Sequence, residues 1–192
     1  MDNILKIINN LGKNLHNEIT IRQLSIDSGV PYTTTHRLIK NNKDLFKINK
    51  KGNIKLVSLN ITDELIKNYL ILSERKETIK YLVKYPEFKT IKRYLPKGNY
   101  TLILFGSRAK EQHRKKSDVD ICIVNKDGKK IISFSQFEHL YDLKVNPITF
   151  TIKEFSEMIK EDEHNLADEI IKNHIILYGE EYFWNMIWKN GI

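Results

Sequence analysis

Two short motifs in the second half of the chain combine residue types that bind phosphate and metal. Gly106-Ser107 follows the apolar run YTLILF, and ten residues separate Ser107 from the pair Asp118-x-Asp120. A glycine lets the backbone approach a phosphate closely because it has no Cβ. Ser107 can cap a following helix, whose free N–H groups favour an anion. Two carboxylates spaced two apart on a strand share one face and repel each other, so we expect Mg²⁺ between them.

The elements on either side of these motifs are predicted to hold them in place. Strands are expected over residues 100–105, 118–124 and 143–151, with a helix over 132–142 and two helical stretches in the tail, over 165–179 and 180–190. The apolar residues between and after the two acids alternate with them, as in a sheet that packs on one face. Strands that alternate with helices predict an α/β layered structure.

The spacing Gly-Ser-x10-Asp-x-Asp resembles the signature of the minimal nucleotidyltransferases, within the DNA polymerase β superfamily. The resemblance covers about residues 98–160 and rests on the strings GSRA and SDVDICIV. It implies that Gly106 and Ser107 position a nucleoside triphosphate, with Arg108 as a further contact, and that Asp118 and Asp120 bind Mg²⁺ or Mn²⁺. The basic stretch over residues 110–116 either adds phosphate contacts or is a solvated loop.

One position departs from the family pattern. The family commonly carries a third carboxylate on the next strand, which helps to bind metal and can assist deprotonation of the attacking hydroxyl. Here that strand reads LKVNPITF, and the aligned residue is Asn146. An amide oxygen can bind a metal, but an amide is a poor base. Asp142 has the same strand parity but lies four residues, about 13 Å, away along an extended chain, so it is a weak substitute.

The first 60 residues are predicted to form three short helices and a β-hairpin. An apolar stripe over residues 2–11 gives the first helix. Gly29 and Pro31 mark the turn between the next two, which would bury Ile21, Leu24 and the pair Leu38-Ile39. Two β-prone runs around the segment from Lys50 to Asn53 give the hairpin. This order resembles a winged helix-turn-helix domain.

In such a domain the second helix of the motif enters the major groove of DNA and basic residues of the wing meet phosphates. The residues that would contact DNA are Thr33, Thr34, His36, Arg37, Lys40, Lys50, Lys51 and Lys55. Winged helices also serve as protein-binding or dimerisation modules, so both roles stay open.

Composition agrees with two modules. The net charge is +8, but residues 1–98 carry 19 Lys and Arg against 9 Asp and Glu, whereas residues 99–192 carry 13 against 15. The basic half would face a polyanion, unless the lysines form only a solvated surface. The single cysteine, Cys122, rules out an internal disulfide and is expected to be a small buried residue. Without a membrane-length apolar run or a signal peptide, a cytoplasmic protein is expected.

The sequence thus predicts an α+β or α/β protein with three regions: a winged helix-turn-helix over 1–60, a helical connector over 61–97, and over 98–192 a nucleotidyltransferase-fold mixed sheet flanked by helices. The expected activity is Mg²⁺-dependent transfer of a nucleotide, AMP from ATP, to a hydroxyl of a protein or small molecule. By resemblance the acceptor could be a helical toxin, with this chain as its antitoxin. The alternative is a DNA-binding regulator with a weak or inactive nucleotidyltransferase-fold domain. The aromatic residues of the tail are expected in the core or at a homodimer contact: Tyr182, Phe183, Trp184 and Trp188.

Overall fold

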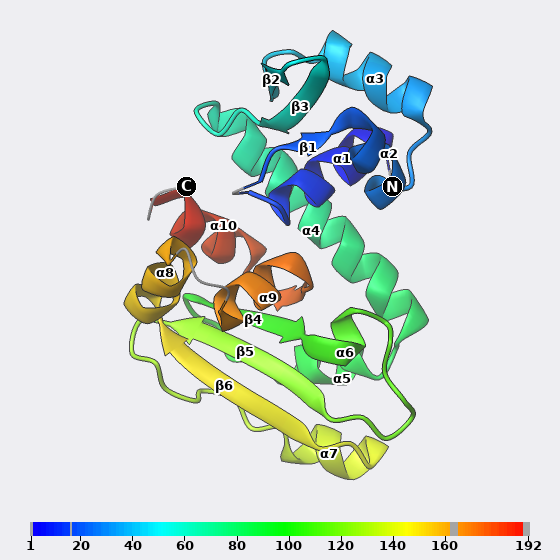
Figure 1. Ribbon diagram of the computed structural model, residues 1–192. Helices are drawn as coiled ribbons and strands as arrows, with labels where there is room; N and C mark the ends of the chain where they lie inside the picture. The colour runs from blue at the N-terminus through cyan, green and yellow to red at the C-terminus, as the bar shows by residue number, and fades with distance from the viewer. Residues whose placement is uncertain (1, 16, 162–164, 190–192) are drawn as a thin grey trace. The chain divides into compact units, whose positions relative to one another are not determined.

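The computed structural model describes residues 2–15, 17–161 and 165–189. Two compact units make up the chain, the first reaching Lys76 and the second starting at Glu77. The long helix α4 (Glu64–Lys84) runs through this boundary (Figure 1). Within the described residues, no helix is both long enough and apolar enough to cross a lipid bilayer.

The first unit contains the predicted helices and hairpin. Its elements are α1 (Asn3–Gly12), β1 (Ile19–Thr20), α2 (Ile21–Ser28), α3 (Tyr32–Asn41), β2 (Phe46–Lys51) and β3 (Ile54–Leu59). The sheet order is β1-β3-β2, and β1, a strand too short to be recognised in the sequence, pairs with Val57 and Leu56 of β3. The element order is the one expected over residues 1–60, while the assignment to the winged helix-turn-helix class stays a prediction.

The turn between α2 and α3 forms for local reasons. The Thr20 side chain accepts a hydrogen bond from the Gln23 N–H and caps α2, and Gly29 ends this helix at φ 63°. Ile21 and Leu24 are buried as expected. On α3 the prediction for one residue was wrong: Thr35 and Ile39 are buried, whereas Leu38 is half-buried. Thr35 fits inside because its hydroxyl donates to the Val30 carbonyl.

The second unit is a four-stranded mixed sheet with helices on both faces (Figure 1). The order is β6-β5-β4-β7, with β5 parallel to β6, and β4 antiparallel to both β5 and β7. The strands are β4 (Tyr100–Phe105), β5 (Val119–Asn125), β6 (Val145–Thr151) and β7 (Ile175–Tyr178). The helices besides α4 are α5 (Phe88–Arg93), α6 (Gly106–Ala109), α7 (Ser135–Tyr141), α8 (Ile152–Lys160), α9 (Leu166–Lys172) and α10 (Glu180–Lys189).

Strand β7 corrects the helical prediction for residues 165–179. Only Leu166–Lys172 is helical there, and β7 follows as an edge strand on β4. The run Ile175–Tyr178 is four apolar residues long, and so short a run does not distinguish a buried strand from a helix by its periodicity. Residues 175–178 form a strand because they pair with β4, about 70 residues earlier in the chain.

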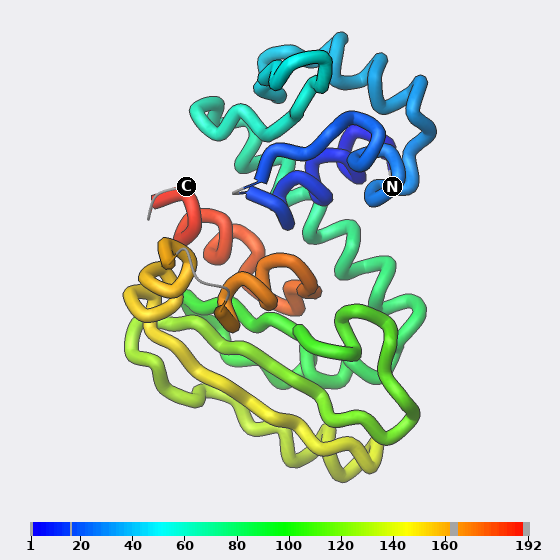
Figure 2. The backbone as a smooth tube through the Cα atoms, viewed as in Figure 1, coloured from blue at the N-terminus to red at the C-terminus, as the bar shows by residue number. Residues whose placement is uncertain are grey.

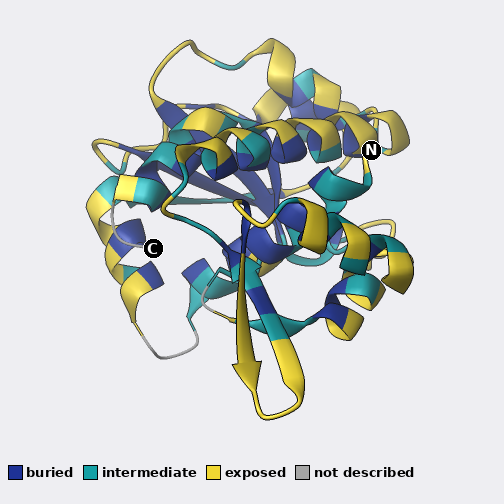
Figure 3. Ribbon diagram, turned by 90° about the horizontal axis from the view of Figure 1, so that it is seen from above, coloured by how far each residue is buried: buried dark blue, intermediate teal, exposed yellow. Residues whose placement is uncertain are grey.

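The two faces of this sheet pack against different helices. The end of α4, with α5 and α7, covers the face that carries Leu102, Leu104 and Ile121. Helices α8, α9 and α10 cover the other face and bury Phe183 and Trp184, so the prediction of tail aromatics in the core is confirmed for these two. Every residue of β4 is buried, and so is every residue of β5 except Asp120 (dark blue strands in Figure 3).

The connector is helical as predicted, in α4 and α5. Four apolar residues of α4 are buried: Ile66, Leu70, Tyr81 and Leu82. Four others are exposed instead: Leu65, Leu72, Ile79 and Val83.

We expect Gly179→Ala to destabilise the second unit by about 3 kcal/mol or more, since left-handed strain and a backbone clash add. Gly179 has φ 77°, and a Cβ there would lie 2.1 Å from the Tyr100 carbonyl oxygen. Both tryptophans belong to this unit, so urea unfolding followed by tryptophan fluorescence measures it directly. Gly128→Ala is the control, because Gly128 has φ 64° but its Cβ would meet the Thr151 methyl at 3.0 Å. An equal loss of unfolding free energy in both variants would contradict the proposed backbone clash.

Candidate active site

The chemistry-bearing residues meet at one end of the sheet. Gly106 directly follows β4, and the end of β4 lies beside the start of β5, where Phe105 pairs with Asp120. Asp120 in turn pairs with Asn146 on β6. Asp118 immediately precedes β5. Figures 1 and 2 show α6 and the loop after it at the same end of the sheet as the starts of β5 and β6.

The two aspartates converge on one atom. The Asn146 Nδ2 group donates to Asp118 Oδ2 at 3.1 Å and to Asp120 Oδ1 at 3.4 Å. Asp118 is exposed, while Asp120 and Asn146 are half-buried, so the point between the acids is open to solvent from one side. An N–H donor, the positive end of an amide dipole, occupies the position where two negative oxygens meet. The arrangement therefore accepts positive charge between the acids.

Gly106 closes the site on the other side. Its φ is 70°, and an added Cβ would lie 2.4 Å from Asp120 Oδ2. Glycine is the residue that adopts this backbone conformation without strain and leaves this space free. The Asp120 carboxylate therefore packs directly against the backbone of Gly106, at the turn where the sequence predicted a phosphate.

Ser107 does not cap a helix, which corrects the prediction. The helix starts one residue earlier, at Gly106, so the N-cap is Phe105, and α6 has only four residues. Ser107 is half-buried, and its carbonyl accepts a hydrogen bond from the Gln112 N–H at 2.9 Å.

Arg108 has partners other than the predicted nucleotide. The residue is 2% exposed. Its Nε donates to the carbonyls of Ser117 and Asp118 at 3.1 and 3.2 Å, and Nη2 donates to the Ser117 carbonyl at 2.6 Å. The guanidinium would have to give up these bonds to reach a phosphate. The geometry does not support the predicted phosphate contact.

Comparison with known proteins identifies the family of the region that carries this site. A sequence profile of the family described as "Polymerase beta, Nucleotidyltransferase" matches residues 89–182. A protein of Methanocaldococcus jannaschii with the provisional name of a protein adenylyltransferase is 30% identical over 99 residues, 47% of this chain and 70% of that relative. The chain belongs to the polymerase β nucleotidyltransferase family. No solved structure matches the chain significantly.

The match confirms the resemblance seen in the sequence. Residues 89–182 contain the four-stranded sheet and the whole of the site at its end. The protein is a nucleotidyltransferase, with a mixed sheet between helices as predicted.

The donor set of this nucleotidyltransferase fits a hard divalent cation. Asp118 and Asp120 offer carboxylate oxygens to one point, and a half-turn of the Asn146 amide would bring its Oδ1 to the same point. Mg²⁺ and Mn²⁺ favour such oxygen ligands and keep several waters. Among the described residues, no three or more His, Cys, Asp or Glu side chains cluster as metal ligands, so two acids and one amide are the set available.

Asp142 lies outside this set, for a reason the sequence did not reveal. It ends α7 in the left-handed region, at φ 51°, and β6 starts only at Val145, so strand parity does not extend back to it. Its side chain is 89% exposed and pairs with Lys116. Glu138, which the sequence analysis missed, anchors β6 instead by accepting a hydrogen bond from the Val145 N–H at 2.8 Å.

A pocket of about 400 Å³ opens beside Asp118. Its lining residues are Lys116, Asp118, Glu138, Asp142, Leu143 and Lys144. Two lysines of the 110–116 loop lie in different places. Lys116 lines this pocket, whereas Lys110 forms an ion pair with Glu169 of α9 at 2.8 Å. Cys122 is buried as expected, and this burial raises the pKa of its thiol to about 12.

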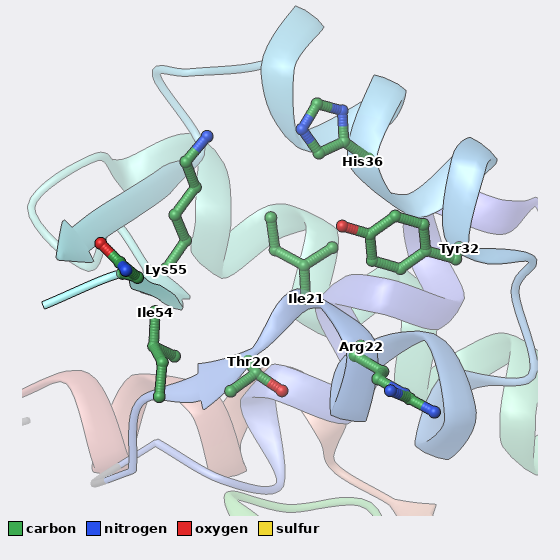
Figure 4. Close-up of a pocket in the computed structure, with 8 residues that line it drawn as sticks. Thr20, Ile21, Arg22, Tyr32, His36, Ile54 and Lys55 are labelled. Atoms are coloured by element: carbon green, nitrogen blue, oxygen red, sulfur yellow. The ribbon is translucent and has the colours of Figure 1, made fainter. Parts of the chain in front are cut away.

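The residues predicted to contact DNA lie on α3 and the hairpin of the first unit. Thr33, Arg37 and Lys40 are exposed on α3, while Thr34 and His36 are half-buried. Lys50 and Lys51 are exposed near the hairpin turn. A pocket of about 310 Å³ lies between the start of α2, α3 and β3 (Figure 4). Its lining is Thr20, Ile21, Arg22, Tyr32, His36, Asn53, Ile54 and Lys55, without an acidic residue.

We expect Asn146→Asp to bind Mn²⁺ about tenfold more tightly than the wild type, since a third carboxylate adds charge to the ligand set. Isothermal titration calorimetry on the metal-free protein measures this. Asn99→Asp, the same change at an exposed position just before β4 and at the other end of that strand from Gly106, is the matched control and should leave the affinity unchanged. Weaker Mn²⁺ binding by Asn146→Asp would show that the residue does not face the cation.

Proposed function

We propose that this nucleotidyltransferase transfers AMP from ATP to a hydroxyl group of a protein acceptor. The observation that carries the proposal is the convergence of Asp118 and Asp120 on one point next to the Gly106 turn. The Methanocaldococcus jannaschii relative, named for adenylyl transfer to protein, supports the choice of nucleotide and acceptor. A helical toxin is one acceptor of this kind, and a small molecule with a hydroxyl is the other class.

The proposed reaction has one displacement step. The acceptor oxygen attacks the α-phosphorus of ATP, a new P–O bond forms, and the bond to the β-phosphate breaks to release pyrophosphate. Asp118 and Asp120, with the Asn146 oxygen, would hold Mg²⁺, which when bound neutralises negative charge on the phosphates. Gly106 would let the triphosphate approach the turn after β4. Asn146 is no base, so the hydroxyl proton passes to water or to an aspartate.

The position of the label in ATP tests this proposal. The protein is incubated with Mg²⁺, a cell extract and ATP labelled at either the α- or the γ-phosphate, and the proteins are separated by electrophoresis. Label from the α-position alone is the expected result, because pyrophosphate carries the γ-phosphate away. Transfer of the γ-label would identify a kinase reaction and contradict the proposal. Competition by unlabelled GTP, CTP and UTP measures the preference for the base.

The basic pocket of the first unit favours a second candidate function, binding of DNA by a regulator whose transfer activity is weak. Arg22 of α2, His36 of α3 and Lys55 of β3 come from three elements to one concave surface that no carboxylate lines. Residues 20–55 carry eight Lys and Arg against two Asp. The negative charge of a DNA phosphate complements this basic surface. Asn146, an amide in place of the third acid, agrees with weak catalysis.

We expect Arg22→Ala/Lys55→Ala to lower the salt dependence of DNA binding. Each lost phosphate contact reduces the slope of log K against log salt by about 0.9, so the double variant should lose about 2. Fluorescence anisotropy with a labelled duplex measures the slope. Lys153→Ala changes an exposed lysine of α8 and is the control, which should keep the wild-type slope. An unchanged slope in the double variant would contradict DNA binding at this pocket.

A further inference from the structure

Arg108 is the one buried arginine among the described residues, and its side chain holds the segment that leads into Asp118. Ser117 and Asp118 lie nine and ten positions later in the chain, yet the guanidinium of Arg108 reaches both of their carbonyls. No carboxylate among the described residues forms an ion pair with it, and its hydrogen-bond partners are backbone carbonyls. The loop after α6 is therefore closed onto β5 by one side chain.

The backbone of Arg108 is fixed as well. The Tyr81 hydroxyl donates to the Arg108 carbonyl at 3.2 Å, from the part of α4 that packs in the core of the second unit. Burial raises the pKa of Tyr81 above its ordinary value, so the hydroxyl keeps its proton and remains a donor. Hydrogen bonds thus connect Tyr81 in the core to Arg108, and Arg108 to the backbone of Asp118.

We propose that Arg108 is a positioning residue that sets the direction of the Asp118 carboxylate toward the metal. Asp118 precedes the first residue of β5, so no ladder bond of that strand fixes its carbonyl. The Arg108 Nε bond to this carbonyl does so instead. The backbone dihedrals set the direction of the Cα–Cβ bond and restrict the side-chain rotamers, so a loosened carbonyl would let the carboxylate turn away from Asp120.

This inference rests on the proposed metal site, and direct Mn²⁺ binding tests it without relying on turnover. The Kd of Mn²⁺ is measured by electron paramagnetic resonance of the free ion, with no nucleotide present. Partners that orient metal ligands contribute about 10- to 100-fold to affinity. We therefore expect Arg108→Gln to raise the Kd about tenfold and Arg108→Lys to raise it less, because lysine can still donate to one carbonyl.

Two further variants separate positioning from folding. Tyr81→Phe removes the hydrogen bond to the Arg108 backbone, keeps the ring in the core, and should raise the Kd about twofold to threefold. Arg93→Ala, an exposed arginine of α5, should leave it unchanged. Thermal unfolding of each metal-free variant shows whether it is folded at the temperature of the titration. Should Arg108→Gln be unfolded there, Arg108→Lys and Tyr81→Phe carry the test.

The outcomes distinguish the two proposals. If the wild type binds no Mn²⁺, or binds it equally after Asp118→Asn/Asp120→Asn, the metal site itself is wrong. If the wild type binds Mn²⁺ through the aspartates while folded Arg108→Lys and Tyr81→Phe bind it with the same Kd, only the role of Arg108 is overturned. A raised Kd in the folded Arg108 variants, with Arg93→Ala unchanged, supports the inference.

Discussion

Replacing Asp118 and Asp120 together by asparagine is expected to lower nucleotide transfer by at least about 10³-fold, since removing a group that stabilises developing charge at such a site costs about 10²–10³ by itself. The two carboxylates converge on the Asn146 amide, 3.1 and 3.4 Å from its nitrogen, so the double variant would leave three neutral amides at one point. Three amides keep oxygen donors but lose the negative charge that holds a divalent cation. Transfer of α-label from ATP to protein, with pyrophosphate release, measures the loss.

The control for this variant is Asp127→Asn. Asp127 is an exposed acid in the turn after β5, at the other end of that strand from Asp120. Its neutralisation changes the net charge of the same unit without touching the site, so activity should stay within about twofold of the wild type. Transfer that survives the double substitution at more than a few percent of the wild-type rate would mean that chemistry takes place elsewhere.

Gly106→Ala is expected to reduce transfer by about 10²-fold or more, because the new methyl group would displace the carboxylate of Asp120, the proposed metal ligand. The Cβ would lie 2.4 Å from Asp120 Oδ2, and the clash is relieved by moving either the carboxylate or the turn after β4. Either movement also narrows the space for the triphosphate. The left-handed φ of 70° adds about 1–3 kcal/mol of backbone strain.

Three measurements on Gly106→Ala separate these effects. Urea unfolding followed by tryptophan fluorescence measures the strain, the Mn²⁺ titration measures displacement of Asp120, and the rate of transfer measures both. Gly128→Ala is the matched control, with φ 64° and a position beside Thr151 at the far end of β6. It should lose similar stability but keep Mn²⁺ affinity and activity. Wild-type Mn²⁺ affinity and transfer in Gly106→Ala would show that the glycine is dispensable.

Several features of the fold could be read from the sequence because they depend on neighbours along the chain. The helices of the first unit follow from local signals: Thr20 caps α2, and Gly29 ends it. The hairpin turns at Gly52, with φ 60°, between two β-prone runs. Thr35 was missed because nothing in the helical pattern shows that its hydroxyl meets the Val30 carbonyl.

Other features depend on residues far apart in the sequence, and local patterns do not reveal them. β7 exists because β4 offers it an edge, and helical periodicity suggested otherwise. The carbonyl partners of Arg108 were not foreseen, because a basic residue next to a phosphate motif resembles a phosphate ligand. Only the closure of the following loop buries it against backbone carbonyls.

For the site itself, the sequence determined the types and spacing of the groups. Asp118 and Asp120 are two residues apart, which predicts a shared face at the start of a strand, and Gly106-Ser107 directly follows the apolar run of β4. The tertiary structure decided which residues of β6 lie beside these aspartates. The parallel register of β5 and β6 sets Asn146 beside Asp120, and the start of β6 at Val145 keeps Asp142 out. Register between strands depends on the packing of the whole sheet, which no short segment of sequence contains.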